Sequence, residues 1–147
     1  MTGDGWPDAR GAFLGLGLGT TRAHLARAVA EGIAASVALL ARAAAADRGA
    51  PLRVLRADGG LTRSRLLVQA QADVLQVPVQ VCAAADATAL GAAALARLGT
   101  GAASTLAEAV GQLPVEATID PSIPEDQAAE RLASFDSALT GALPDRP

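Results

Sequence analysis

The pattern of apolar and polar positions between Pro51 and Gln71 predicts a strand, a glycine turn and a helix. A short apolar run at 54–57 ends at Asp58, Gly59 and Gly60, and from Thr62 onward apolar residues recur at the spacing of a helix. These helical positions are Leu66, Leu67, Ala70 and Val74. Two glycines at such a junction remove both Cβ atoms, so a ligand can lie against main-chain N–H groups at the positive end of the helix. The geometry suits a nucleotide, although a Gly-Gly turn is more often only a turn.

A second strand is predicted at Val77–Cys82, which reads VPVQVC, because the residues alternate and several are β-branched, with Pro78 near the beginning. A strand, a helix and another strand form a β-α-β unit, whose strands should run parallel and be joined by a right-handed crossover. The predicted fold class is therefore α/β.

A long amphipathic helix is predicted from about Thr21 to Asp47, with Thr20 or Thr21 as its cap and with Gly49 and Pro51 at its end. The segment before it, GLGLGTT, carries three glycines and follows a short apolar stretch, 12–16, that could form a strand.

This glycine-rich segment does not fit a dinucleotide fingerprint. A fingerprint that starts at Gly15 would need a third glycine at Thr20. One that starts at Gly17 would need a glycine at Arg22, so the pattern fails in both frames and disfavours an NAD-binding enzyme. We expect a flexible turn that leads into the long helix.

Residues that could bind a metal are sparse. His24 is the single histidine, without a second histidine or a carboxylate at ligand spacing, so we expect it to pack or to form a hydrogen bond. Cys82 is the single cysteine, which excludes an internal disulfide and a cysteine-based zinc site. No metal ligand and no catalytic residue is predicted in this chain.

Ala87–Leu98 is predicted to form a small-residue helix with Gly91 inside it. Glycine in a helix interior costs about 1 kcal/mol relative to alanine, so we expect a close approach at that face, by another helix more readily than by a ligand. Beyond Gly99 the pattern predicts a short helix, an extended segment and a charged amphipathic helix, at Ser104–Val110, Val115–Asp120 and Glu125–Leu139. The last helix should dock through Leu132, Phe135 and Leu139.

Composition indicates one soluble domain with a core of small side chains. The chain has 147 residues, of which 51% are hydrophobic, 18% are charged and only three are aromatic. A net charge of −3 and scattered arginines argue against nucleic-acid binding and against an anionic membrane surface. Uncharged runs such as Gly32–Ala41 are too short to span a bilayer, and Met1–Arg10 lacks the basic segment of a secretory signal. We therefore expect a cytoplasmic protein.

Three segments, in the expected order, resemble the FGGY family of carbohydrate kinases. Residues 11–31, GAFLGLGLGTTRAHLARAVAE, resemble the second signature of the family, with Ala30 in place of a larger apolar residue. Residues 56–79, RADGGLTRSRLLVQAQADVLQVPV, resemble its adenosine-binding segment. Residues 86–99, DATALGAAALARLG, resemble the E-x-x-A-x-G-A-A segment that follows, with Asp86 in place of glutamate. The resemblance covers about Ala9–Gly99 and is strongest to the glycerol kinases of the family.

This resemblance implies ATP as the cofactor, with Mg as part of the ATP complex rather than bound by identifiable residues of this chain. It implies that Gly59, Gly60 and Ser64 contact the adenosine. Ser64 stands where glycerol kinases commonly have asparagine, so a hydroxyl replaces an amide there. In the family, the catalytic aspartate and the polyol-binding domain lie upstream of the matched segments, so this chain is expected to lack both.

The implied fold is a partial actin-like (ribonuclease H-like) ATPase domain with a parallel β-α-β core and long helices, whose first strands precede Met1. We expect a loose lead-in at 1–10, the kinase domain portion at 11–110, and an extended segment with a C-terminal helix at 111–147.

Two functions are compatible with this reading. The chain could be the ATP-binding part of a kinase that transfers the γ-phosphate to an alcohol group of a glycerol-like polyol, inactive in isolation and dependent on an N-terminal kinase half to bind the carbohydrate. It could instead be a non-catalytic module that binds a nucleotide or forms a homo-oligomer.

Overall fold

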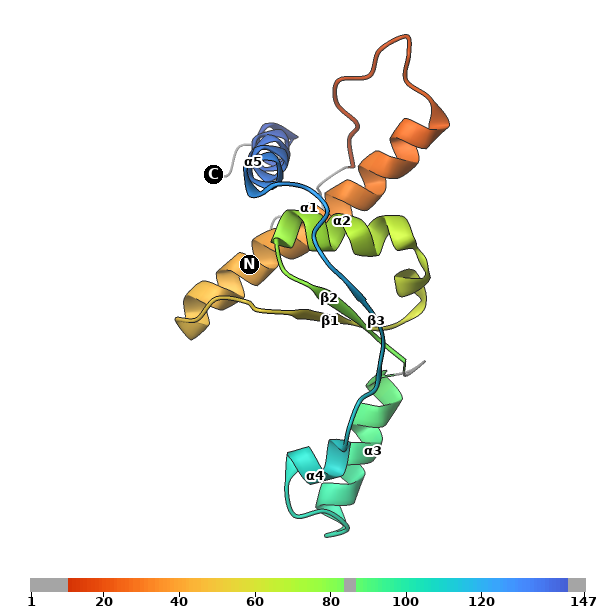
Figure 1. The fold of residues 1–147 in the computed structure, drawn as a ribbon, viewed down its shortest axis with the longest axis vertical. Helices are drawn as coiled ribbons and strands as arrows, with labels where there is room; N and C mark the ends of the chain where they lie inside the picture. The colour runs from red at the N-terminus through yellow and green to blue at the C-terminus, as the bar shows by residue number, and fades with distance from the viewer. Residues whose placement is uncertain (1–10, 84–86, 143–147) are drawn as a thin grey trace.

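The computed structural model describes residues 11–83 and 87–142. In chain order its elements are α1 (Arg22–Arg48), β1 (Leu55–Ala57), the 3₁₀ turn η2 (Gly60–Arg63), α2 (Arg65–Leu75), β2 (Val79–Cys82), α3 (Ala87–Gly99), α4 (Leu106–Val110), β3 (Val115–Ile119) and α5 (Glu125–Ala142) (Figure 1). The predicted lead-in at 1–10 and Asp86 lie outside the described residues.

The sheet has three strands in the order β1-β2-β3. β1 and β2 are parallel, with Leu55 opposite Val79, which confirms the predicted β-α-β unit. β3 is antiparallel to β2, with a register irregularity between Val81 and Cys82, so the sheet is mixed. The second strand begins at Val79 rather than Val77. Pro78 has no N–H to donate, but its carbonyl accepts a hydrogen bond from the Leu55 N–H at 3.0 Å.

One apolar cluster joins α2 to the sheet. It is formed by buried Val68, Ala72, Val79 and Val81, with Leu55, Ala57 and Ile119 packed against them. Ala72 and Val79 are completely buried, so the middle of α2 rests directly on the parallel strands. This packing fixes the position of the turn that connects β1 to α2.

A second cluster joins α1 to α5, and alanines dominate the α1 side of it. The buried residues of α1 are Ala30, Ala34, Ala35 and Ala38. Leu132 of α5 lies against Ala35 and Ala38, with Phe135 packed at the margin. The predicted docking of the last helix through Leu132 and Phe135 is therefore confirmed, and half-buried Leu139 lies further along the same helix.

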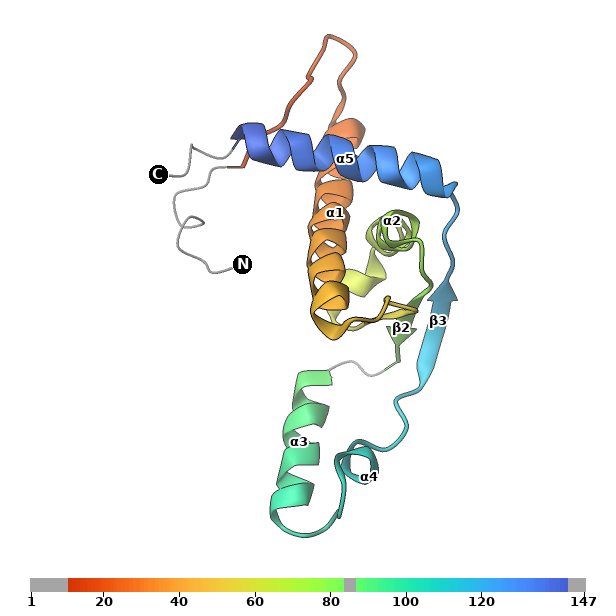
Figure 2. The same ribbon diagram turned by 90° about the vertical axis from the view of Figure 1, so that its left-hand side faces the viewer.

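α3 and α4 form a separate arm. Ala94, Ala103 and Ala109 are buried against one another, and Figure 2 shows both helices extending away from the sheet. A Cβ on Gly91 would meet nothing within 4 Å. The expected close helix contact at Gly91 is therefore wrong for the described part of the chain.

The apolar stretch 12–16 is not a strand. No strand among the described residues pairs with this stretch, and Gly15 interrupts it with a φ of +71°. Leu14 and Leu16 are exposed. Apolar character alone could not distinguish a strand from an exposed extended segment here.

By length and composition alone, α1 is long and apolar enough to cross a membrane. The uncharged runs in the sequence, such as Gly32–Ala41, are too short to indicate this. The core helices of soluble proteins have the same property. In this fold α1 packs its alanine face in the domain, carries an ion pair between Arg27 and Glu31, and has 22% of its apolar window buried.

Candidate functional site

The predicted glycine turn follows the carboxyl end of β1. Gly59 has φ +89° and ψ 179°, a backbone conformation that essentially only glycine adopts. Its carbonyl accepts hydrogen bonds from the Thr62 N–H at 3.2 Å and from the Thr62 hydroxyl at 2.7 Å. These two bonds close the turn and start η2.

Neither the backbone conformation nor the packing of the described chain requires glycine at position 60. Its φ lies outside the left-handed region, and a Cβ placed on it would meet no atom within 4 Å. Both Gly59 and Gly60 are exposed. The space in front of Gly60 is therefore open for a group that is not part of this chain to approach the backbone.

Ser64 caps the helix that follows. The Leu67 N–H donates to the Ser64 Oγ at 3.3 Å, so α2 begins at Arg65 and not at Thr62 as predicted. The cap occupies one lone pair of the hydroxyl, and its O–H and second lone pair remain for another partner. The structure thus has Gly59, Gly60 and Ser64 on one exposed turn, in which η2 begins at Gly60 and leads to the N-terminus of α2.

Positive charge lies at the α2 end of this turn, whereas the exposed Asp58 precedes Gly59. Arg63 and Arg65 are exposed on either side of Ser64, and the positive end of the α2 dipole lies at the same place. Arg56 of β1 donates from Nε to the Gln80 Oε1 at 3.3 Å. Guanidinium groups beside a helix N-terminus favour an anionic ligand such as a phosphate.

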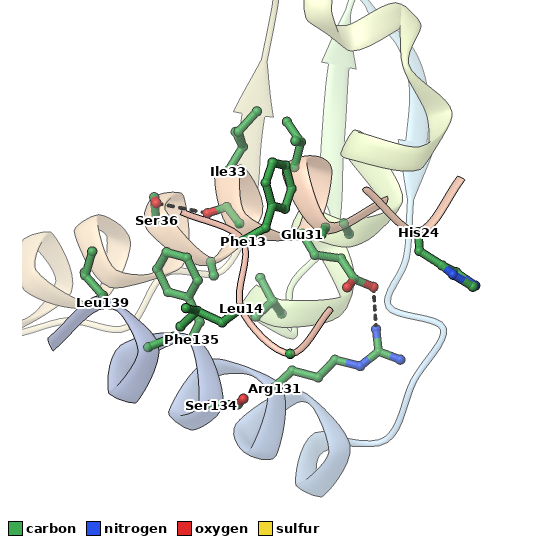
Figure 3. Close-up of a pocket in the computed structure, with 18 of the residues that line it drawn as sticks. Phe13, Leu14, His24, Glu31, Ile33, Ser36, Arg131, Ser134, Phe135 and Leu139 are labelled. Atoms are coloured by element: carbon green, nitrogen blue, oxygen red, sulfur yellow. Dashed lines mark hydrogen bonds and ion pairs between the residues drawn. The ribbon is translucent and has the colours of Figure 1, made fainter. Parts of the chain in front are cut away.

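A groove of about 1340 Å³ lies away from this turn, between the 11–16 segment, α1 and α5. Figure 3 shows side chains from all three reaching it, with Arg131 turned toward Glu31. The Glu31 carboxylate accepts from Arg27 at 2.8 Å and pairs with Arg131 at 3.4 Å. The hydrogen bond and charge of Glu31 raise the pKa of the Arg27 guanidinium. Glu31 and Arg131, which both line this groove, therefore pair with each other.

Sequence reasoning missed Asp73, the buried charged residue of α2. One carboxylate oxygen, Oδ1, accepts from the Ser122 N–H at 2.7 Å, the Ser122 hydroxyl at 2.9 Å and the Gln69 side chain at 2.9 Å. In a second contact between these segments, the Gln76 side-chain amide donates a hydrogen bond to the Ile123 carbonyl at 3.2 Å. These bonds hold the segment before α5 against α2. An aspartate between Ala72 and Val74 on the apolar face of a helix was the available signal.

His24 forms a hydrogen bond, as predicted, because its Nδ1 accepts from the Thr21 N–H at 3.2 Å at the start of α1. No group of three or more His, Cys, Asp or Glu side chains that could hold a metal is found in residues 11–83 and 87–142.

Comparisons with known proteins agree on one family. The sequence profile of the C-terminal domain of the FGGY family of carbohydrate kinases matches residues 5–99. The chain is 46% identical over 133 residues to the glycerol kinase of Bordetella parapertussis, which covers 90% of this chain and 26% of that protein.

Solved structures of such kinases have the same fold. The glycerol kinase of Plasmodium falciparum, solved with ADP, superposes with a TM-score of 0.78 at 28% identity over 95% of this chain and 28% of that one. The xylulose kinase of Rhodospirillum rubrum gives 0.74 at 34% identity over 92% of this chain and 28% of that one. The chain thus spans about a quarter of the length of the relatives that it matches.

Proposed function

Because the chain belongs to the FGGY family of carbohydrate kinases, as a part of the C-terminal domain, we propose that the turn Gly59–Ser64 binds the adenosine part of ATP or ADP. The observation that carries this proposal is Gly60. It lies with Gly59 and Ser64 on one exposed turn at the N-terminus of α2, and the space in front of its backbone is open to a ligand.

The residues present fit an adenine nucleotide. A nucleoside can lie against the backbone at Gly59 and Gly60, while the Ser64 hydroxyl can donate to a ring nitrogen without giving up its cap. Arg63 and Arg65 supply positive charge for the phosphates. Mg would arrive with the phosphates of ATP, as expected for the family.

The reaction of the whole kinase would be transfer of the γ-phosphate from ATP to an alcohol group of a polyol or sugar, in the cytoplasm. That step requires the acceptor and the γ-phosphate to be held in line while charge on the transferred group is neutralised. A chain that spans a quarter of its relatives supplies one wall of the nucleotide cleft. We therefore expect the isolated chain to bind nucleotide weakly and to show no turnover with glycerol.

The alternative is a non-catalytic module that binds a nucleotide or associates with other chains. It is favoured by the exposure of large aliphatic side chains on α1, including Ile33 and Leu40. Restored kinase activity in the presence of the rest of a related kinase would separate the first function from this one.

Titration calorimetry with ADP on the wild-type chain and on Gly60→Val tests the proposed site. A branched side chain in the space in front of Gly60 should exclude the ligand and lower affinity at least roughly tenfold. The variant should keep its fold, because the added atoms meet nothing in the described chain, and circular dichroism checks this. Equal affinities for the two proteins would show that the glycine turn is not the binding site.

A further inference from the structure

The Ser64 hydroxyl keeps both a hydrogen-bond donor and an acceptor for a ligand. Its Oγ accepts from the Leu67 N–H at 3.3 Å, and the side chain is exposed. The half-buried Thr62 hydroxyl, by contrast, donates to the Gly59 carbonyl at 2.7 Å within the turn. The O–H bond of a serine rotates to suit its partner, so the hydrogen and the second lone pair of Ser64 are not fixed in direction.

Three backbone carbonyls of the turn are already engaged. The Gly59 carbonyl accepts from both the N–H and the hydroxyl of Thr62, which fills its two lone pairs. The Leu61 carbonyl accepts from the Ser64 N–H at 3.0 Å, and the Ser64 carbonyl accepts from the Val68 N–H at 3.1 Å. Side chains, more than these carbonyls, are therefore left to read the edge of a nucleobase.

The charged side chains of the turn do not distinguish one purine from the other. Arg63 and Arg65 are exposed and carry hydrogen-bond donors only, whereas the exposed Asp58, when ionised, accepts only. Guanine offers O6 and N7 to a donor and its N1–H and amino group to a carboxylate. Adenine offers N7 to a donor and its amino group to a carboxylate. Each charged side chain can therefore pair with either base, and none of them excludes guanine.

A serine hydroxyl does not select between the two purines either. It can donate to N7, which both bases carry, or to guanine O6, and it can accept from the amino group of adenine. Selection of adenine needs a donor and an acceptor held together in fixed geometry, as in the side-chain amide of asparagine or glutamine. The sequence contains neither residue between positions 58 and 65.

This inference rests on the proposed function: we infer that Ser64 sets the nucleobase specificity of the turn and that it admits guanine nucleotides as readily as adenine nucleotides. The ligand class of the site is then a purine nucleoside diphosphate or triphosphate, and not ADP and ATP alone. The rotatable hydroxyl supplies the recognition, while the open space in front of Gly60 accommodates a base of either kind.

Titration of the 147-residue chain with ADP and with GDP, followed by nitrogen–proton correlation spectra, tests this inference. The two ligands differ only in the base, so the contribution of ribose and phosphates cancels in the ratio of their dissociation constants. For the wild-type chain the two constants should agree within about threefold. Ser64→Asn should make ADP bind at least about fivefold more tightly than GDP, because its amide offers adenine a fixed donor and acceptor.

Ser64→Thr is the matched control. It keeps a hydroxyl and a capping oxygen, so the ratio of the two constants should remain that of the wild type. Urea unfolding of both variants checks that α2 keeps its cap. ADP binding to the wild-type chain at least about tenfold tighter than GDP binding would overturn the inference. An equal ratio in wild type and Ser64→Asn would overturn it as well, because the residue at position 64 would then not read the base.

Failure of the proposed function has a different signature. If neither nucleotide produces saturable shifts in the wild-type chain, the nucleotide site itself is rejected, and the inference with it. Saturable shifts at 59–67 with ADP and none with GDP would keep the proposed site and reject only its lack of selection between the bases.

Discussion

Gly59 and Gly60 are neighbours in the turn, but the chain depends on them for different reasons. Gly59 holds φ +89° and ψ 179°, and a side chain there should cost about 1–3 kcal/mol of stability. Gly60 has ordinary φ and an open Cβ position, so alanine should stabilise the fold by about 0.4–1 kcal/mol by restricting the unfolded chain. Urea unfolding of Gly59→Ala and Gly60→Ala should therefore shift in opposite directions. Equal destabilisation would mean that Gly60, too, is kept for the fold.

Ser64 has two roles that substitutions can separate. Ser64→Ala removes the cap on the Leu67 N–H and should cost about 0.5–2 kcal/mol of stability, so its effect on binding is hard to interpret. Ser64→Asn and Ser64→Asp both keep a capping oxygen, but an ionised aspartate has no donor for the adenine. We expect similar unfolding midpoints for the two variants and weaker ADP binding for Ser64→Asp, by a few-fold to about tenfold. Calorimetry that finds equal affinities would show that adenine binding does not need a hydrogen-bond donor on the side chain at position 64.

At the scale of elements, Asp73 connects α2 to the segment that leads into α5. Its carboxylate is buried and satisfies the N–H and hydroxyl of Ser122 together with the Gln69 amide. Asp73→Ala removes the acceptor of both Ser122 donors, while Gln69 keeps the Asp120 carbonyl, and should destabilise the chain by about 1–3 kcal/mol. Asp136→Ala, at an exposed position of α5, should change stability by less than about 0.5 kcal/mol. Chemical denaturation measures both, and similar values for the two variants would contradict this role of Asp73.

Several elements could be predicted from local pattern because local forces decide them. α1 follows from a capping threonine, a helical apolar period and Gly49, which ends it with φ +64°. The strand β1 and the turn after it follow from an apolar run that stops at two glycines. The start of α2 was predicted three residues early, because the hydroxyls of Thr62 and Ser64 bond locally and favour a 3₁₀ turn before the helix.

Other features depend on partners that are distant in sequence. Nothing near residues 12–16 indicates whether a neighbouring strand is available to pair with them. The role of Asp73 depends on Ser122, 49 residues away. The residues of the candidate site, in contrast, were identified through resemblance to a family and not through packing, and the structure adds the observation that Gly60 has no packing reason to be glycine.

At the scale of the whole molecule, the proposed nucleotide site would be one wall of a cleft on a partial domain. α2 rests on β1 and β2, so the turn Gly59–Ser64 lies on a supported edge of the domain (Figure 1). The groove between the 11–16 segment, α1 and α5 lies apart from this turn, because none of its lining residues comes from 59–64.

The most direct test of the central claim is a nitrogen–proton correlation spectrum of the 14.6 kDa chain titrated with ADP. Backbone amides from Gly59 to Leu67 should shift the most, in a saturable manner, because the proposed ligand lies against that turn and the first turn of α2. The spectrum of Gly60→Val under the same titration should change little. Shifts confined to the groove between α1 and α5, or no saturable shifts at millimolar ADP, would contradict the account.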